Sequence, residues 1–200
     1  MKPRILILFA HPAFEKSRVN RVLIQNLASM EGITFRDLYQ EYPDFDIHVP
    51  NEKALLEAHE LLVFHYPMYW YSTPSLIKEY LDLVLEHGWA YGMKGNALQG
   101  KYMMHVITTG AQEKTYGKAG SNHFTIRQLL APMEQTASLC KMHFLPPFVV
   151  YGSLLKTEQE IDAFRHDLEL LYHAFLDKVI DFEKAAKVSC LNSLIPELKK

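Results

Sequence analysis

The chain has 200 residues, 48% of them hydrophobic and 22% charged, and a formal net charge of -2 at pH 7. These values predict one globular domain with a sizeable core, and the near-neutral charge excludes a global attraction to nucleic acid or anionic lipid. Two cysteines are too few for a disulfide framework or a zinc cluster, and no apolar run is long enough to span a bilayer. We therefore expect a soluble, cytoplasmic protein.

In the first part of the chain, apolar β-rich runs alternate with helical patterns, which is typical of a parallel sheet covered on both faces. The continuous apolar run over residues 5–9 predicts a central parallel strand. Apolar residues then recur at helical spacing over residues 19–27. A second strand is expected over residues 34–39, followed by a short helix with Asn51 as its N-cap.

Three further strands complete the predicted sheet. Two of them cover residues 60–66 and 101–109. The last lies within residues 142–151, with Pro146 and Pro147 confined to its start, where lost backbone donors matter least. The helix after the third strand begins with Thr73 as its cap and Pro74 at its first position. The last helix begins at Thr157, which forms a capping box with Glu160, and its apolar stripe runs as far as Val179.

These elements predict a single domain over residues 1–187 and a loosely packed C-terminal extension over residues 188–200. The expected fold is an α/β, flavodoxin-like three-layer sandwich around a five-stranded parallel sheet of order 2-1-3-4-5. In such sheets the ligand lies beyond the carboxyl ends of the strands, near the point where the strand order reverses. This rule nominates three loops, at residues 11–17, 67–73 and 108–116.

The first loop leads into Ser17, Arg18 and Asn20 at the start of a helix. Free amides and the positive end of the helix dipole make such a start suitable for a phosphate. The turn contains no G-x-G-x-x-G, and no Walker lysine motif occurs in the chain, so a dinucleotide fingerprint or P-loop is not supported. In the alternative interpretation, Ser17 is simply an N-cap.

The second loop is rich in aromatic residues, with Tyr66, Tyr69, Trp70 and Tyr71 close together around Pro67. Pro67 forces an extended approach, after which backbone groups can meet the polar edge of a flat ring. The alternative is an aromatic hinge packed into the core. The loop lies near the point where the strand order reverses, the switch point of the sheet, and this position favours the ligand-binding interpretation.

The third loop begins with residues 108–111, where Gly110 permits close approach of the backbone to a ligand. Tyr116 and His123 follow and are candidate proton donors, although single tyrosines and histidines are more often structural or surface groups. No HExxH or comparable spacing occurs among the histidines, so no metal site is assigned. A serine hydrolase is not supported either, because the sequence has no G-x-S-x-G elbow.

Six segments together resemble a known family. They are residues 10–12 with 17–20, 37–39, 42–46, 67–71 with 73–74, 88–92 and 108–110. The chain is similar to the NAD(P)H:quinone oxidoreductase family of flavodoxin-like fold, in its short bacterial branch. That branch includes ancillary proteins of glutathione-gated potassium-efflux systems and general-stress-type quinone reductases. The resemblance spans about residues 4–180.

The resemblance implies a flavin-dependent NAD(P)H:quinone oxidoreductase, that is, an NAD(P)H dehydrogenase (quinone), with two-electron, ping-pong hydride transfer via FMN. NAD(P)H is the implied electron donor and a quinone the acceptor. FMN is favoured over FAD because the chain is short and has no evident extra domain for an adenosine half.

The resemblance also implies which residues hold the flavin. Those implied at its phosphate and ribityl region are His11, Ser17, Arg18, Val19 and Asn20. Those implied at its isoalloxazine ring are Pro67, Met68, Tyr69, Trp70, Thr108, Thr109, Gly110 and Ala111. Tyr116 matches a family tyrosine near the ring and is a candidate catalytic residue. His123 is a second candidate and falls one residue late relative to the family pattern.

Family resemblance further implies a homodimer with the flavin near its interface. The aromatic segments 42–45 and 89–91 belong either to that interface or to the core. One alternative function is a regulatory ancillary subunit that binds a glutathione-gated potassium-efflux transporter and so lies peripherally at the inner membrane. Another is an FMN-dependent azo- or nitroreductase, which shares the chemistry and differs in the acceptor.

Overall fold

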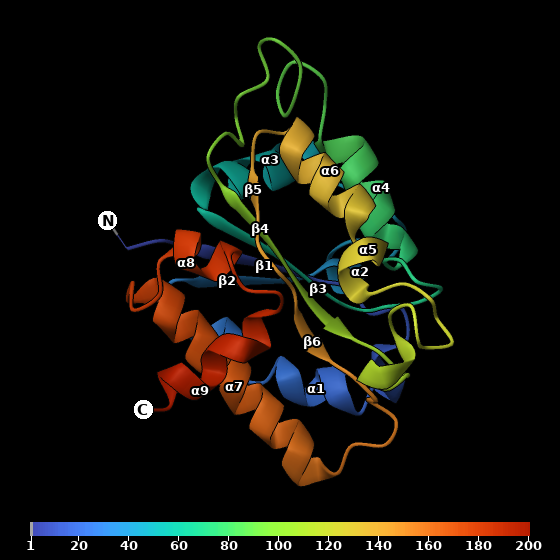
Figure 1. The fold of residues 1–200 in the computed structure, drawn as a ribbon. Coiled ribbons are helices and arrows are strands. Elements are labelled where there is room, and N and C mark those ends of the chain that lie inside the picture. Colours follow the sequence, from blue (N-terminus) through green and yellow to red (C-terminus); the bar gives the residue numbers. More distant parts are fainter. Residues whose placement is uncertain (1) are drawn as a thin grey trace.

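The computed structural model describes residues 2–200 and consists of a parallel sheet between two layers of helices (Figure 1). The strands are β1 (Ile5–Phe9), β2 (Ile33–Asp37), β3 (Leu61–Pro67), β4 (Tyr102–Thr108), β5 (His143–Phe144) and β6 (Phe148–Val150). The α-helices are α1 (Val19–Leu23), α2 (Leu38–Glu41), α3 (Val49–Ala58), α4 (Ser75–Val84), α5 (Ile126–Leu129), α6 (Ala131–Leu139), α7 (Glu158–Leu176), α8 (Phe182–Ala186) and α9 (Ile195–Leu198). Short 3₁₀ turns are η1 (Phe14–Lys16), η2 (Leu27–Ser29), η3 (Glu113–Thr115) and η4 (Leu191–Leu194).

The strands pair in the order β2-β1-β3-β4-β5, and β6 also pairs with β4. All of these pairings are parallel. The predicted flavodoxin-like sandwich with strand order 2-1-3-4-5 is therefore confirmed. The order reverses between β1 and β3, whose carboxyl ends lie side by side because Phe9 is in register with His65.

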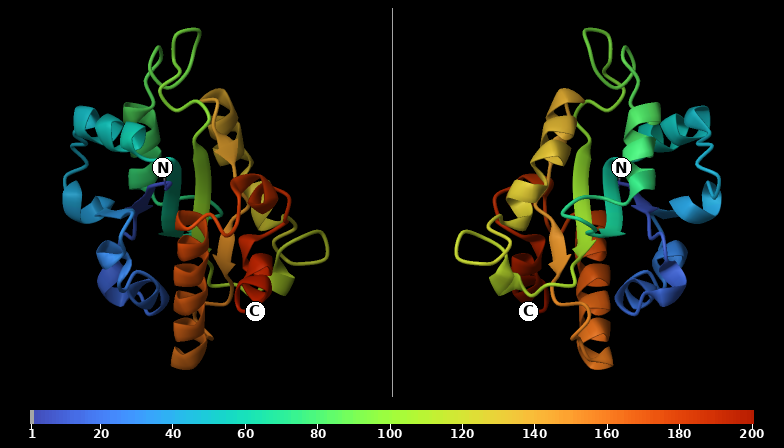
Figure 2. Two further views of the ribbon diagram at one scale, coloured as in Figure 1. Left: turned by 90° about the vertical axis from the view of Figure 1, so that its left-hand side faces the viewer. Right: turned by 90° about the vertical axis from the view of Figure 1, so that its right-hand side faces the viewer.

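Each face of the sheet carries its own core, because alternate side chains of a strand point to opposite faces. Leu6 and Leu8 of β1 pack with α3, α4 and α6, whereas Ile5 and Ile7 pack with α1, α7, α8 and α9. The two views of Figure 2 show these helix layers on opposite sides of the strands. β1 is fully buried, which explains its unbroken apolar run.

The predicted fifth strand is divided into two pieces. Pro146 and Pro147 stand between β5 and β6, and both pieces pair with β4. We expected a single strand within residues 142–151, with the two prolines confined to its start. They instead separate two short strands, because proline supplies no backbone N–H to the ladder.

The first part of the chain differs from its predicted boundaries at two places. β2 ends at Asp37, whose carboxylate accepts a hydrogen bond from the Tyr39 amide at 3.1 Å and so starts α2 instead of continuing the strand. The helix α3 begins earlier than expected, with His48 rather than Asn51 as its N-cap. The ring Nδ1 of His48 accepts from the Asn51 amide at 3.3 Å.

Two other helix ends also differ. The helix α4 begins at Ser75 with Pro74 as its N-cap residue, so the proline precedes the first helical position. The capping box of Thr157 and Glu160 at the start of α7 is present as predicted. That helix ends at Leu176, and Val179 is 71% exposed instead of continuing the apolar stripe.

The last residues are packed rather than loose. Leu191, Leu194 and Ile195 are buried in the core beneath α7. The side-chain amide of Asn192 pairs with the backbone of Val149, accepting from its N–H at 2.8 Å and donating to its carbonyl at 3.1 Å. The tail therefore covers the free edge of β6, which would otherwise expose unpaired backbone groups.

The aromatic segments that were assigned either to an interface or to the core make contacts within the chain. Tyr42 is buried, and its hydroxyl donates to Glu52 at 2.5 Å. The indole of Trp89 donates to Glu57 of α3 at 2.7 Å, and Lys53 lies over its ring. Within residues 2–200, no helix is both long and apolar enough to cross a bilayer.

Candidate functional site

A cavity of about 450 Å³ opens at the carboxyl ends of β1, β3 and β4, where the strand order reverses. Its lining comprises His11, Ala13, Lys16, Ser17, Arg18, Val19, Asn20, Pro67, Met68, Tyr69, Thr108, Gly110, Ser153 and Leu154. Most of the residues predicted from the sequence to hold a cofactor are thus brought together. Trp70, Thr109, Ala111, Tyr116 and His123 lie outside this lining.

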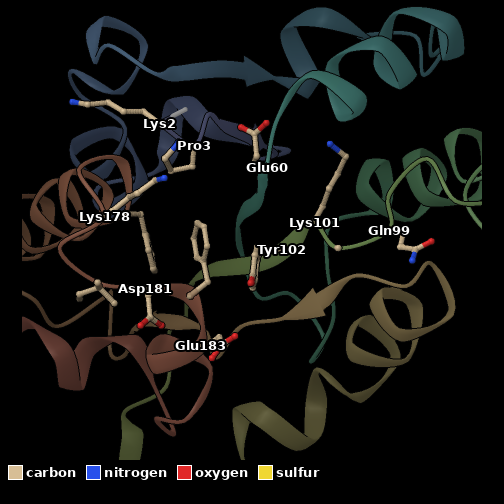
Figure 3. Close-up of a pocket in the computed structure, with 13 residues that line it drawn as sticks. Lys2, Pro3, Glu60, Gln99, Lys101, Tyr102, Lys178, Asp181 and Glu183 are labelled. Atoms are coloured by element: carbon tan, nitrogen blue, oxygen red, sulfur yellow. The ribbon is translucent and has the colours of Figure 1, made fainter.

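A larger cavity of about 730 Å³ lies at the opposite, amino ends of β3 and β4 (Figure 3). Lysines and carboxylates mix in its lining, and several of them already have partners. The ammonium of Lys101 donates to the carbonyls of Glu57 and His59 at 2.8 and 2.7 Å, and Lys2 pairs with Asp177. Because ligands of open α/β sheets bind at the carboxyl ends of the strands, the smaller cavity is the better candidate site.

Asn20 is the polar centre of the candidate site. Its buried side-chain amide donates to the hydroxyl of Thr108 at 3.0 Å and to that of Ser17 at 3.3 Å. Its Oδ1 lies 3.2 Å from Nε2 of His65 on β3. The start of α1 is in this way joined to the ends of β3 and β4.

Two histidines stand at this end of the sheet. Burial lowers the pKa of His65 to about 3, with a further contribution from the nearby His11. Burial also lowers the pKa of His11, whose Nδ1 accepts a hydrogen bond from the Ala13 amide at 3.2 Å. Both rings are therefore neutral at physiological pH, and the proton of His11 is on Nε2.

The charged residues that line the cavity are both cations, Lys16 and Arg18. The guanidinium of Arg18 also donates to the carbonyl of Lys156 at 3.2 Å, which joins the first loop to the segment after β6. Among residues 2–200, the lining combines two cations, four hydroxyl-bearing residues and the amide of Asn20, and it contains no carboxylate. This composition favours an anionic group of a ligand.

The aromatic loop after β3 forms a tight turn. Tyr69 and Ser72 exchange both backbone hydrogen bonds, at 3.1 and 3.0 Å. Between them Trp70 and Tyr71 have positive φ values of 50° and 64°, a strained conformation for bulky residues. Tyr69 lines the cavity, whereas Trp70 is 93% exposed at the tip of the turn.

Sequence reasoning missed the segment after β6, which contributes Ser153 and Leu154 to the lining. The Thr109 carbonyl accepts from the Ser153 amide at 2.8 Å, and the Ala111 carbonyl accepts from the Gly152 amide at 2.9 Å. The φ of Gly152 is +66°, a conformation that favours glycine. The rule that nominated the other loops applies here too, since β6 is parallel to β4 and ends at the same edge.

The two candidate proton donors differ in their surroundings. Tyr116 is half-buried against Tyr151, and burial raises the pKa of its phenol, so that it stays protonated at neutral pH. His123 is exposed and has a φ of 59°. Its neighbour Asn122 accepts a hydrogen bond from the Tyr71 hydroxyl at 3.3 Å, so the loop of His123 contacts the aromatic turn. No group of three or more potential metal ligands converges within residues 2–200.

Fold and cavity together define a flavodoxin-like α/β protein with a site suited to a ligand that has an anionic end and an apolar part. The sequence model described as "Flavodoxin-like fold" (Flavodoxin_2) matches residues 3–171. The chain belongs to this family.

Two relatives agree with this assignment. The chain is 46% identical over 149 residues to general stress protein 14 of Bacillus subtilis, which covers 74% of this chain and 85% of the relative. It is 48% identical over 161 residues to KefG of Serratia proteamaculans, an ancillary protein of a glutathione-regulated potassium-efflux system. That match covers 80% of this chain and 88% of the relative.

Solved structures are similar over most of the chain. A general stress protein 14 of Treponema denticola in complex with FMN has a TM-score of 0.81 at 33% identity, covering 86% of this chain and 99% of that one. An NADPH-quinone reductase of P. pentosaceus has a TM-score of 0.75 at 27% identity, covering 83% and 95%. A protein named as a thermophilic tryptophan halogenase from Streptomycin violaceusniger has a TM-score of 0.80 at 44% identity, covering 82% and 95%. Since these names differ, likeness of fold does not define the reaction.

Proposed function

We propose that this chain is an FMN-dependent NAD(P)H:quinone oxidoreductase. The observation that carries the proposal is the cavity at the switch point, which combines cations and hydroxyls from the first loop with Pro67, Met68 and Tyr69. The FMN complex of the Treponema relative and the name of the P. pentosaceus reductase support the choice of cofactor and reaction.

The residues present fit FMN. Lys16 and Arg18 would hold its phosphate together with the hydroxyls of Ser17 and Thr108. Asn20, whose side-chain amide donates to both hydroxyls, would lie next to the ribityl region. The isoalloxazine ring would lie against Pro67, Met68 and Tyr69, with Trp70 at the rim and the backbone of residues 109–111 beside it. The cavity volume of about 450 Å³ lies within the range of small-molecule sites, which is about 300–1,000 Å³.

When bound, FMN would supply the two-electron redox chemistry, while the protein contributes binding, orientation and electrostatics. Tyr116 stays protonated because burial raises the pKa of its phenol, and it can donate a hydrogen bond where negative charge develops. His123 would be a second proton donor. It lies on a loop that contacts the aromatic turn through the hydrogen bond between Tyr71 and Asn122.

The experiment that tests this function uses the purified full chain. On titration of the protein with FMN, binding should quench the fluorescence of the flavin. The FMN-loaded protein should oxidise NADH or NADPH with a benzoquinone as acceptor. Replacing Arg18 by Ala should weaken FMN binding, whereas the matched change Arg127→Ala, on α5, should not. A protein that binds no FMN and turns over no quinone would reject the proposal.

A second candidate function is supported by the identity of 48% to the KefG relative. In this role the chain would be a regulatory ancillary subunit, held at the inner membrane by a potassium-efflux transporter. Co-purification with such a transporter, compared between wild type and an FMN-free variant, separates the two roles. Association that is independent of FMN would indicate a regulatory function, and no association in either sample would exclude it.

A further inference from the structure

His65 lies behind the candidate site and makes none of the proposed cofactor contacts. It is fully buried on β3, and it is absent from the cavity lining. Its Nε2 lies 3.2 Å from Oδ1 of Asn20, a residue that does line the cavity. The side-chain hydrogen bond of His65 thus connects it to the cavity lining through Asn20.

The amide of Asn20 fixes the direction of two further hydrogen bonds. Its Nδ2 donates to the hydroxyl oxygens of Ser17 and Thr108, and the Ser17 oxygen also accepts from the Asn20 backbone amide at 3.1 Å. Within residues 2–200 neither hydroxyl donates a hydrogen bond of its own. Each hydroxyl proton is thus available to a ligand in the cavity.

An asparagine amide rotated by half a turn has nearly the same shape but exchanges donor and acceptor. In that orientation Oδ1 of Asn20 would face Ser17 and Thr108, and each hydroxyl would donate to it. The hydroxyls would then turn lone pairs toward the cavity. The tautomer of His65 selects between the two arrangements. In one, Oδ1 of Asn20 accepts a hydrogen bond from Nε2–H of His65; in the other, Nδ2 of Asn20 donates a hydrogen bond to an unprotonated Nε2.

The surroundings of His65 favour one tautomer. Its Nδ1 has no hydrogen-bond partner within residues 2–200. A proton on Nδ1 would be a buried N–H without an acceptor, which is rare and costly in proteins. A proton on Nε2 is instead accepted by Oδ1 of Asn20.

We propose that His65 is a positioning residue whose Nε2–H holds the Asn20 amide so that the Ser17 and Thr108 hydroxyls donate toward an anionic ligand group. The identity of that group as the phosphate of FMN rests on the proposed function. An ionised phosphate only accepts hydrogen bonds, whereas the hydroxyls of the ribityl chain both donate and accept. The ratio of the affinities for FMN and riboflavin therefore reports the orientation of the amide.

The binding test compares wild type, His65→Leu, His65→Gln and His105→Leu by fluorescence titration of the full chain with FMN and with riboflavin. The Nε2 of glutamine is as many bonds from the backbone as the Nε2 of histidine, so His65→Gln restores the donor. His105 is the matched control, because it is also a fully buried histidine and its Nδ1 pairs with the Tyr66 hydroxyl at 3.0 Å, outside the cavity lining.

We expect His65→Leu to weaken FMN binding about tenfold or more and riboflavin binding by less than about threefold. His65→Gln should keep FMN binding within about threefold of wild type, and His105→Leu should lower the affinities for both flavins equally or not at all. Two results would overturn the proposal. One is that His65→Leu loses equal affinity for FMN and for riboflavin, and the other is that His65→Gln binds FMN as weakly as His65→Leu does.

A second measurement uses the wild-type protein alone, so it depends neither on the folding of a variant nor on flavin binding. Nitrogen NMR of the imidazole rings in the ligand-free wild type should identify His65 as the Nε2–H tautomer, and the Nδ1–H tautomer would overturn the proposal. If the wild type binds neither FMN nor riboflavin, the proposed function fails. The tautomer then still tests the role of His65 on its own.

Discussion

The side-chain amide of Asn20 lies 3.0 Å from the hydroxyl of Thr108, and this hydrogen bond joins the start of α1 to the end of β4. The two residues are 88 positions apart in the sequence and meet because β1 and β4 flank β3 with their carboxyl ends at one edge. This bond holds together the polar residues of the candidate site, and removing it tests their role directly.

Replacing Thr108 by Val keeps the shape of the side chain and removes the hydroxyl. Asn20 then loses a buried acceptor, so we expect the free energy of unfolding to fall by about 1–2 kcal/mol. FMN affinity should fall about tenfold. Urea unfolding and fluorescence titration measure the two effects. The control is Thr136→Val on α6. The Thr136 hydroxyl donates to the Pro132 carbonyl of its own helix, outside the cavity lining, so its loss should leave FMN binding unchanged.

Trp70 lies at the tip of the aromatic turn with a φ of 50° and 93% of its surface exposed. Replacement by Gly should leave the stability unchanged or raise it by up to about 1 kcal/mol, because glycine adopts positive φ without strain and little buried area is lost. Under the proposed function the same change weakens FMN retention. Lys199→Ala, at an exposed side chain near the C-terminus, is the control. Equal flavin content in the two purified variants would contradict the role of Trp70.

Asn192 covers the edge of β6 through two hydrogen bonds with Val149. We expect Asn192→Ala to lower the free energy of unfolding by about 1–3 kcal/mol and to speed hydrogen exchange at the Val149 amide. Ser193→Ala removes only a bond from an exposed hydroxyl to the Cys190 carbonyl and should cost little. Equal exchange rates at Val149 in the two variants would show that the tail does not protect this edge.

The stability should depend on pH through the buried histidines. Burial lowers the pKa of His65 and of His105, each to about 3. In the unfolded chain each pKa is about 6.5, so the unfolded state binds more protons below that pH. Their contribution to stability is complete above pH of about 6.5 and is lost toward about 3, by up to about 1.4 kcal/mol per pH unit for each histidine.

Urea unfolding at several pH values measures this loss. The variant His105→Leu should have a shallower slope below pH of about 6.5 than the wild type, because one buried protonation site is gone. Identical slopes would mean that His105 is not buried in its neutral form.

Features that follow from local patterns or from general connection rules could be predicted from the sequence. The apolar run of β1, the capping box of Thr157 and Glu160, and the order of the strands follow from periodicity, side-chain chemistry and connection rules. The three loops of the site were also predictable, since parallel strands end at one edge of a sheet.

Features that depend on long-range contacts were not predictable in this way. We expected a loosely packed tail, yet Leu191 and Ile195 are buried, and Asn192 pairs with Val149 of β6, which lies far away in the sequence. His65 looks like one polar residue in an apolar strand, and only the fold places its ring beside Asn20. Ser153 and Leu154 carry no motif, and they enter the site because β6 ends beside β4.

The central claim is that the switch-point cavity holds a flavin that accepts electrons from NAD(P)H. The most direct measurement is the visible absorption spectrum of the purified full chain after addition of FMN and removal of unbound flavin. The account predicts a retained flavin band that NADH or NADPH bleaches without oxygen and that a benzoquinone then restores. A protein that retains no FMN, or whose bound FMN is not bleached by either nucleotide, would contradict it.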